Sequence, residues 1–217
     1  MFVGREEELG KLEGLYNSGS FQMAVVYGRR RVGKTALINE FCKGKRALSF
    51  TALDQSDADN LADFNRAVGN FFNLPASLGG FSTWGDALSY VAEQARSERF
   101  VLVFDEFPFA AERNEALPSI FQVAIDKVFK ETAAFIILCG SNQGFMESKV
   151  LGRKSPLFGR RTAQIKLGDL GFRDAAKMLP GLSAQEAFRF YGCFGGVPYS
   201  LQQVDSSTSL RETLAQL

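Results

Sequence analysis

The feature that most constrains this chain is the segment 28–35, which reads Gly-Arg-Arg-Arg-Val-Gly-Lys-Thr. Its spacing is that of a phosphate-binding loop. The apolar run 23–27 before it predicts a buried strand, and residues 34–41 after it have the periodicity of an amphipathic helix. Glycines allow successive backbone N–H groups to point into one concavity at the helix N-terminus, where partial positive charge favours phosphate.

Each residue type in this pattern has a chemical reason. In it the lysine, here Lys34, reaches the β and γ phosphates, and the hydroxyl of Thr35 can ligate Mg²⁺. A glycine-rich turn beside a basic patch is the alternative interpretation. The strand before the loop and the helix after it favour the phosphate loop, so the segment predicts binding of a nucleoside triphosphate.

Composition limits the other possibilities. The chain has 217 residues and 46% hydrophobic residues, enough for one α/β domain with a small appendage. Lys+Arg 25 against Asp+Glu 24 leaves a net charge of +1, which argues against broad electrostatic binding of nucleic acid but leaves a local patch possible. The absence of histidine excludes histidine metal sites and Ser-His or Cys-His catalysis.

The cysteines and the hydropathy indicate the compartment. The three cysteines are odd in number and far apart in sequence, as expected of free thiols in a reducing cytosol. No apolar run approaches the length of a membrane span, and no signal peptide opens the chain. We therefore expect a cytoplasmic protein with no membrane partner.

Strand and helix patterns alternate along the chain. Further strands are expected at 46–52, 100–104, 134–139 and 162–167. Helices are expected at 6–16, after the capping residues 54–57, at 84–96 and around 117–129, with a loop at 75–82 and short helices after 168. This alternation predicts a three-layer α/β sandwich with a mostly parallel sheet.

An acidic pair, Asp105 and Glu106, ends the most apolar strand. Ligands of open α/β sheets bind at the carboxyl ends of the strands. Asp105 can hold the hydration shell of Mg²⁺, and Glu106 can orient and deprotonate an attacking water. A solvated turn is the alternative interpretation, but with a phosphate loop upstream the pair predicts hydrolysis rather than binding alone.

Polar residues after two later strands extend the site. Ser141 ends the strand expected between the loop strand and the Asp105 strand, where its hydroxyl can contact the γ phosphate or the water. Arg160 or Arg161 could supply a guanidinium to the γ phosphate of a neighbouring copy. Ordinary turn chemistry and surface arginines are the respective alternatives.

The kind of nucleotide and acceptor can also be narrowed. A GTPase would have an Asn-Lys-x-Asp-type segment after a late strand, and neither 138–142 nor 164–167 offers one. A small-molecule kinase usually lacks the Asp-Glu pair and has an arginine-rich lid over its acceptor. The sequence therefore favours ATP as the nucleotide and water as the acceptor.

Together these motifs resemble the archaeal and prokaryotic predicted ATPases of the AAA-like STAND group. The motifs that carry the resemblance are the segments 2–6, 27–35, 104–108, 138–141, 155–162 and 195–199. The resemblance implies an ASCE-type sheet of five parallel strands in the order 5-1-4-3-2, with an ATPase core at 1–168 and a helical lid at 169–217. It also implies that Val3-Gly4-Arg5 borders the adenine, that Pro198 helps the lid to close, and that Arg160 is the arginine finger.

The candidate site residues fall into three groups. The catalytic candidates are Lys34, Glu106, Ser141 and Arg160. The nucleotide-binding candidates are Gly4, Arg5, Gly28, Arg29, Arg30, Arg31, Val32, Gly33, Lys34, Thr35, Ala36 and Pro198. The magnesium candidates are Thr35 and Asp105.

The first functional hypothesis is an Mg²⁺-dependent ATPase whose turnover drives a conformational change in attached or partner domains. The second is a slow ATP/ADP-controlled switch or scaffold of the STAND type, and the third is a DNA-binding remodeller, against which the near-neutral charge argues. Family members usually continue into a winged-helix segment and a nuclease-like region. We therefore expect this chain to be part of a longer protein, with DNA contacts, if there are any, made by the downstream domains, and with self-association if Arg160 acts in trans.

Overall fold

A parallel five-stranded sheet forms the centre of the molecule. The computed structural model describes residues 2–75, 79–205, 208 and 210–215. The strands are β1 (Gln22–Gly28), β2 (Ala47–Thr51), β3 (Val101–Asp105), β4 (Phe135–Gly140) and β5 (Ala163–Leu167). They lie in the order β2-β3-β4-β1-β5 with every neighbouring pair parallel. This confirms the predicted order 5-1-4-3-2.

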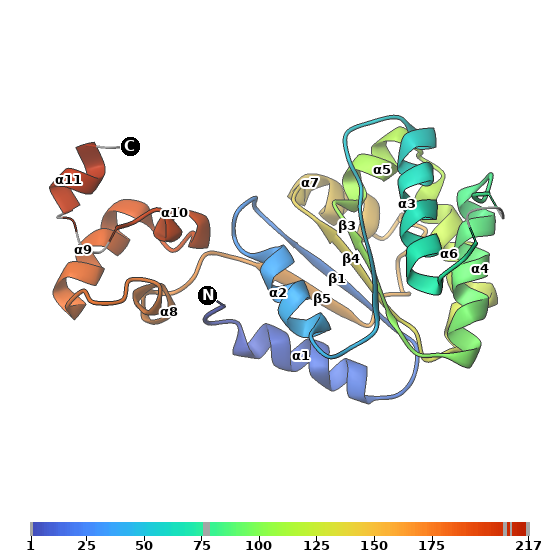
Figure 1. Cartoon of the computed structure of the whole chain (residues 1–217), viewed down its shortest axis with the longest axis horizontal. Helices are drawn as coiled ribbons and strands as arrows, with labels where there is room; N and C mark the ends of the chain where they lie inside the picture. The colour runs from blue at the N-terminus through green and yellow to red at the C-terminus, as the bar shows by residue number, and fades with distance from the viewer. Residues whose placement is uncertain (1, 76–78, 206–207, 209, 216–217) are drawn as a thin grey trace.

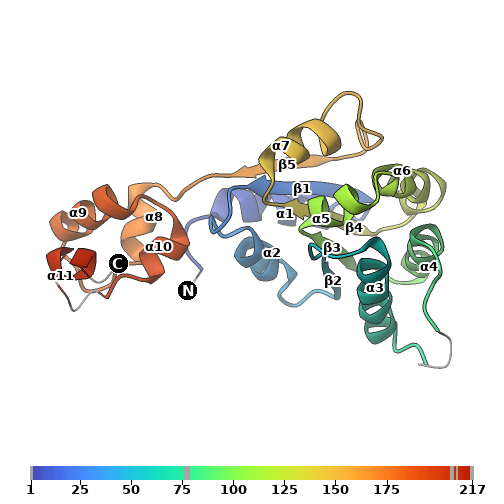
Figure 2. The same ribbon diagram turned by 90° about the horizontal axis from the view of Figure 1, so that it is seen from above.

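Helices cover both faces of this sheet, as Figures 1 and 2 show. On one face lie α1 (Glu6–Asn17) and α2 (Lys34–Cys42), and on the other lie α3 (Asp57–Phe72), α4 (Trp84–Ser97) and α6 (Leu117–Lys127). The side chains of successive residues in each strand point to opposite faces of the sheet. In β1, Ala24 and Val26 pack with α1 and α2, whereas Met23 and Val25 join the opposite cluster. Because both faces are covered, the inner strands β1, β3 and β4 are buried along their whole length, whereas the edge strands β2 and β5 alternate buried and more exposed residues.

Short helices at the ends of two strands were not predicted. Directly after β3 lies α5 (Phe107–Arg113), and after β4 lie α7 (Gln143–Phe145) and a π-helical turn, η3 (Met146–Val150). With so few residues, neither segment shows a recognisable period. A proline at the first turn of α5 is a helix-start signal that the prediction did not use. Part of the predicted loop 75–82, residues 76–78, lies outside the described residues.

The C-terminal helices build a separate small core beside the phosphate-loop end of β1 (Figure 1). They are α8 (Phe172–Lys177), α9 (Ala184–Phe194), α10 (Pro198–Gln202) and α11 (Leu210–Ala215), and a single segment after β5 leads into them. Leu170, Phe190 and Leu201 are buried there, and Val3 of the N-terminal segment packs against them. The boundary at 168/169 stays a prediction.

One backbone contact closes the turn between α9 and α10. The amide of Leu170 donates to the carbonyl of Gly196 at 2.7 Å. A Cβ on Gly196 would lie 1.9 Å from the Leu170 carbonyl oxygen. Only glycine therefore allows this approach. Among the described residues, the structure contains no helix with the length and apolarity needed to cross a membrane.

Candidate nucleotide site

The loop between β1 and α2 has a backbone that requires glycine at both ends. Gly28 has φ +156°, and a Cβ there would lie 2.2 Å from the carbonyl oxygen of Leu167 on β5. Gly33 has φ +96° and precedes the first residue of α2. Arg31, between them, also has a positive φ of +71°. The loop therefore turns sharply enough to face its amides toward the N-terminus of α2.

Lys34 lies at the base of this loop and is almost fully buried. Its ammonium donates to the carbonyl oxygens of Gly28 at 3.0 Å and Arg29 at 2.9 Å. Both acceptors are neutral, so the ammonium keeps its full charge for an anion in the loop. Burial strengthens that preference, because a buried charge gains most from an opposite charge.

Thr35 and Asp105 come from different parts of the chain and meet beside the loop. The Thr35 hydroxyl donates to Asp105 Oδ2 at 3.1 Å, and the Glu106 amide donates to Asp105 Oδ1 at 2.9 Å. Hydroxyl and carboxylate oxygens are the donors that Mg²⁺ prefers. No group of three or more His, Cys, Asp or Glu side chains in the described part of the chain could hold a metal. A cation at this pair would therefore complete its shell with phosphate and water oxygens.

Glu106 is held in an unusual backbone conformation, with φ +49°. Its side chain lines the cavity beside the loop. Ser141, at the end of the adjacent strand, donates to Glu106 Oε2 from its amide at 3.1 Å and from its hydroxyl at 2.9 Å. A non-glycine residue in the left-handed region is often found at a functional site, where neighbouring contacts hold the strain.

The cavity of about 510 Å³ lies between the phosphate loop and the C-terminal helices. Its volume is in the range of small-molecule sites. The predicted residues that line it are Arg5, Arg30, Arg31, Val32, Gly33, Lys34, Thr35, Ala36, Glu106 and Pro198. The predicted residues outside the lining are Gly4, Gly28, Arg29, Asp105, Ser141 and Arg160. Of these, Gly28, Arg29, Asp105 and Ser141 contact lining residues directly.

Arg5 connects three segments around the cavity. Its guanidinium donates to the carbonyls of Gly168 at 2.6 Å and Val32 at 3.2 Å. Its neighbour Gly4, at φ +52°, lies so close to Asp174 of α8 that a Cβ would meet the Asp174 Cγ at 2.2 Å. The N-terminal segment therefore fixes the phosphate loop against the start of the C-terminal helices.

Several lining residues were not predicted. They are Phe2, Phe109, Leu170, Met178, Tyr199 and Gln202, most of them apolar. Phe2 and Tyr199 belong to quoted motifs, so position within a motif was the available signal. Val3, expected from the resemblance to border the adenine, also lines the cavity. Phe109 lies in α5, a helix that the sequence pattern did not reveal. Apolar residues beside a polar loop suit a flat heterocyclic base next to its phosphates.

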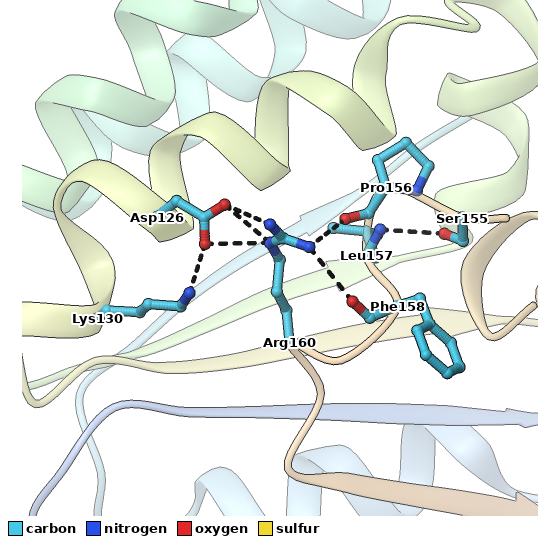
Figure 3. A network of polar contacts seen from close by, with 7 residues as sticks. All are labelled: Asp126, Lys130, Ser155, Pro156, Leu157, Phe158 and Arg160. Atoms are coloured by element: carbon cyan, nitrogen blue, oxygen red, sulfur yellow. Dashed lines mark hydrogen bonds and ion pairs between the residues drawn. The ribbon is translucent and has the colours of Figure 1, made fainter. Parts of the chain in front are cut away.

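Arg160 is not among the residues that line this cavity. Figure 3 shows its side chain directed toward Asp126 and the backbone at Pro156 and Phe158. Its Nε and Nη2 bind the carboxylate of Asp126 on α6, and its Nη1 donates to the carbonyls of Pro156 at 2.8 Å and Phe158 at 3.3 Å. Hydrogen bonds from Arg160 and then Lys130 hold the pKa of Asp126 below its usual value. Arg160 lies three positions before Ala163, the first residue of β5, at the amino edge of the sheet and opposite the loop. It does not reach the nucleotide site of its own chain.

Arg161 is also engaged within the chain. Its Nη1 donates to the Leu151 carbonyl at 3.1 Å, and its guanidinium carbon lies 5.5 Å from the centroid of the Phe158 ring. The role of either arginine toward a neighbouring copy stays a prediction.

Comparison with known proteins agrees with this geometry. Residues 2–204 match the model of a family described as an ATPase domain predominantly from Archaea. An uncharacterised protein of Methanocaldococcus jannaschii is 32% identical over 204 residues, which are 94% of this chain and 44% of that protein. The chain thus spans less than half the length of this relative.

Solved structures share the fold. A Walker-type ATPase of Pyrococcus abyssi has a TM-score of 0.71 at 17% identity, over 99% of this chain and 72% of that one. The ORC2 protein of Aeropyrum pernix has a TM-score of 0.69 at 13% identity, over 98% and 68% of the two chains. At these identities the similarity confirms the three-layer P-loop ATPase fold alone.

Proposed function

Because the chain belongs to the family of ATPase domains found predominantly in Archaea, we propose that it binds ATP at segment 28–35 and hydrolyses it. The observation that carries the proposal is the convergence of Lys34, the Thr35–Asp105 pair and Glu106 on one cavity. Fold alone does not specify activity. The chemistry of these four side chains is what supports hydrolysis.

The binding residues would work as follows. The Lys34 ammonium exchanges the loop carbonyls for β and γ phosphate oxygens, while the loop amides and the N-terminus of α2 add further donors. Thr35 and Asp105 hold Mg²⁺ by direct or water-mediated contacts. A bound Mg²⁺ neutralises charge that develops on the β and γ phosphates. Val3 and Leu170, two apolar residues of the cavity lining, would contact the adenine.

Glu106 would act on the water. Its carboxylate lines the cavity and one oxygen, Oε2, accepts both bonds from Ser141, which fixes the plane of the group. The orientation of the carboxylate also sets the direction of its other oxygen, Oε1. This oxygen can accept a proton from a water placed in line with the γ phosphate. Ser141 is the residue through which the state of the phosphate would be sensed.

Hydrolysis would move the C-terminal residues 169–217 as a lid on the core 1–168, and so drive attached or partner domains. Arg160 would complete the site of a neighbouring copy. The second candidate is a slow ATP/ADP-controlled switch of the STAND type. The two bonds from Ser141 to Glu106 distinguish the candidates, because they would restrain the carboxylate in a switch and orient it in an ATPase. Measured turnover separates the two candidates.

Glu106→Gln tests the proposal directly. The amide keeps the shape of the side chain and cannot take a proton, so ATP binding should persist while hydrolysis falls at least about tenfold. Binding is measured by calorimetry and hydrolysis by phosphate release in the presence of Mg²⁺. Glu112→Gln is the matched control, because Glu112 lies outside the cavity lining and bonds Asn142. Unchanged turnover in Glu106→Gln removes Glu106 from its role, and a wild-type protein that binds no ATP removes the proposal.

A further inference from the structure

A second contact joins the phosphate loop to the C-terminal helices. The guanidinium carbon of Arg31 lies 4.2 Å from the centroid of the Tyr199 ring. Arg31 belongs to the loop, Tyr199 belongs to α10, and both line the nucleotide cavity. Tyr199 is 44% exposed, so its side chain is only partly enclosed by the protein.

The Arg31 side chain carries one of the positive charges of the cavity lining, to which Arg5, Arg30 and Lys34 also belong. A cation–π contact uses the face of the guanidinium, whereas its N–H donors lie in the plane of the group. Within the described residues, this guanidinium contacts the Tyr199 ring and forms no hydrogen bond or ion pair. The donors are therefore available to the cavity, and the planar fork suits phosphate oxygens.

The backbone brings the two residues together at a point where the loop is already strained. Arg31 has φ +71°, in the region that favours glycine, so its side-chain direction differs from that of its neighbours. Next to it, Pro198 Cγ lies 3.8 Å from the position of a Cβ on Gly33. Two adjacent residues at the start of α10, Pro198 and Tyr199, thus lie against the end of the phosphate loop.

We propose that Tyr199 is a positioning residue that holds Arg31 for the polyphosphate of the nucleotide. The inference rests on the proposed ATP site. With its face on the ring, the guanidinium can direct its edge to phosphate oxygens without losing the ring contact. Phosphate binding and docking of α10 then favour each other, because each restricts the same side chain. The arrangement makes the docking of α10 depend on phosphate rather than on the adenine.

The test is a double-mutant cycle on nucleotide binding, measured by calorimetry with a non-hydrolysable ATP analogue and with AMP. Arg31→Ala should weaken the analogue at least about tenfold, the loss expected for a hydrogen bond to a charged group. Tyr199→Leu should weaken it about two- to fivefold, the equivalent of an exposed cation–π contact. AMP, which lacks the β and γ phosphates, should be affected much less by either change. The double variant should bind no more weakly than Arg31→Ala alone.

Two controls separate positioning from general effects. Arg153→Ala removes the same charge from an exposed position outside the cavity lining, so binding should stay near the wild-type value. Tyr199→Phe keeps the ring and should bind like the wild type, which separates loss of the ring from loss of the fold. Amide exchange of 198–202 should slow with the analogue in the wild type and not in Arg31→Ala.

Three results would overturn the inference. They are Tyr199→Leu with wild-type affinity, Arg153→Ala as weak as Arg31→Ala, and single-variant losses that add in the double variant. None of these touches the proposed ATP site, which fails only if the wild-type protein does not bind the analogue. The two failures are therefore distinguishable.

Discussion

Ser141 commits both of its donors to one oxygen atom of Glu106, the amide at 3.1 Å and the hydroxyl at 2.9 Å. A hydroxyl has a single proton, so the Ser141 hydroxyl cannot donate that proton fully to Glu106 and to a γ phosphate at the same time, whereas the amide can keep its bond to Glu106. If Ser141 senses phosphate, its hydroxyl does so by leaving Glu106, and the position of the carboxylate then reports which contact the hydroxyl has formed.

Ser141→Ala should lower ATP hydrolysis about three- to tenfold with little change in ATP affinity. The variant removes one charge-assisted hydrogen bond and leaves the amide, so the carboxylate is oriented less strictly. Turnover and affinity are measured separately, because a loss confined to turnover marks an interaction made in the transition state.

Two substitutions serve as comparisons for Ser141→Ala. Ser141→Thr keeps the hydroxyl and should retain most of the activity. Ser155→Ala removes a hydroxyl that accepts from the Leu157 amide at 3.1 Å, remote from Glu106, and should leave turnover unchanged. Faster turnover in Ser141→Ala would contradict an orienting role and show that the contact restrains Glu106.

Gly196→Ala should separate the turn between α9 and α10 from the backbone of Leu170. The added Cβ would meet the Leu170 carbonyl oxygen at 1.9 Å, and neighbouring backbone cannot move aside as a flexible side chain does. Overpacking of this kind costs about 1–3 kcal/mol. We expect lower thermal stability and faster amide exchange in 198–202.

Gly192→Ala is the matched control for this glycine. A Cβ there has no heavy atom within 4 Å among the described residues, and alanine favours helix over glycine by about 1 kcal/mol. The control variant should be as stable as the wild type or more stable. Equal stability of both variants would contradict the close approach of Gly196 to Leu170.

The sequence was sufficient for the parts of the site that depend on local chemistry. Gly28, Gly33 and Lys34 define a loop whose spacing already specifies its conformation, and the apolar run before Asp105 places that residue at a strand end. Strand order followed from the family resemblance. These features are encoded by neighbours in sequence, where period and turn chemistry are informative.

Contacts between distant segments could not be obtained in the same way. Nothing in the local sequence of Arg160 indicates that Asp126 of α6 binds it, and nothing near Tyr199 indicates Arg31. Each pairing depends on how loops return over the sheet. Helix α5 was missed for another reason, because seven residues give less than two periods of a helix.

The cysteines should differ strongly in reactivity. Cys193 is exposed, whereas burial raises the pKa of Cys42 to about 11 and raises that of Cys139 well above its usual value. The thiolate is the reactive form, so the folded protein should react rapidly with one equivalent of a thiol reagent at neutral pH. Mass spectrometry should locate the label on Cys193, and unfolding in guanidinium should release the other two. Rapid labelling of Cys139 in the folded protein would contradict its place in the central sheet.

The ion pair of Arg160 with Asp126 should stabilise the fold in a pH-dependent way. Arg160, and then Lys130, hold the pKa of Asp126 below its usual value. The contribution is therefore complete above the unfolded-state pKa of about 4 and is lost as the pH falls through the lower folded-state pKa. Because the pair is partly exposed, Arg160→Ala should reduce the free energy of unfolding by about 1 kcal/mol at pH 7. Urea unfolding from pH 7 down to about 3 should show this difference disappear, while exposed Arg153→Ala shows none.

The same pair offers a test of the proposed trans role of Arg160. Asp126→Ala breaks the ion pair but leaves the guanidinium free to reach a neighbouring copy, whereas Arg160→Ala removes it. If Arg160 acts in trans, Arg160→Ala should lower turnover by at least about a hundredfold, as expected when an arginine finger is lost. Asp126→Ala should not cause this loss. Wild-type turnover per molecule should then rise with protein concentration, since each site needs a second copy. Similar small losses in both variants would show that Arg160 only holds the 156–158 backbone against α6, since both substitutions release that contact equally.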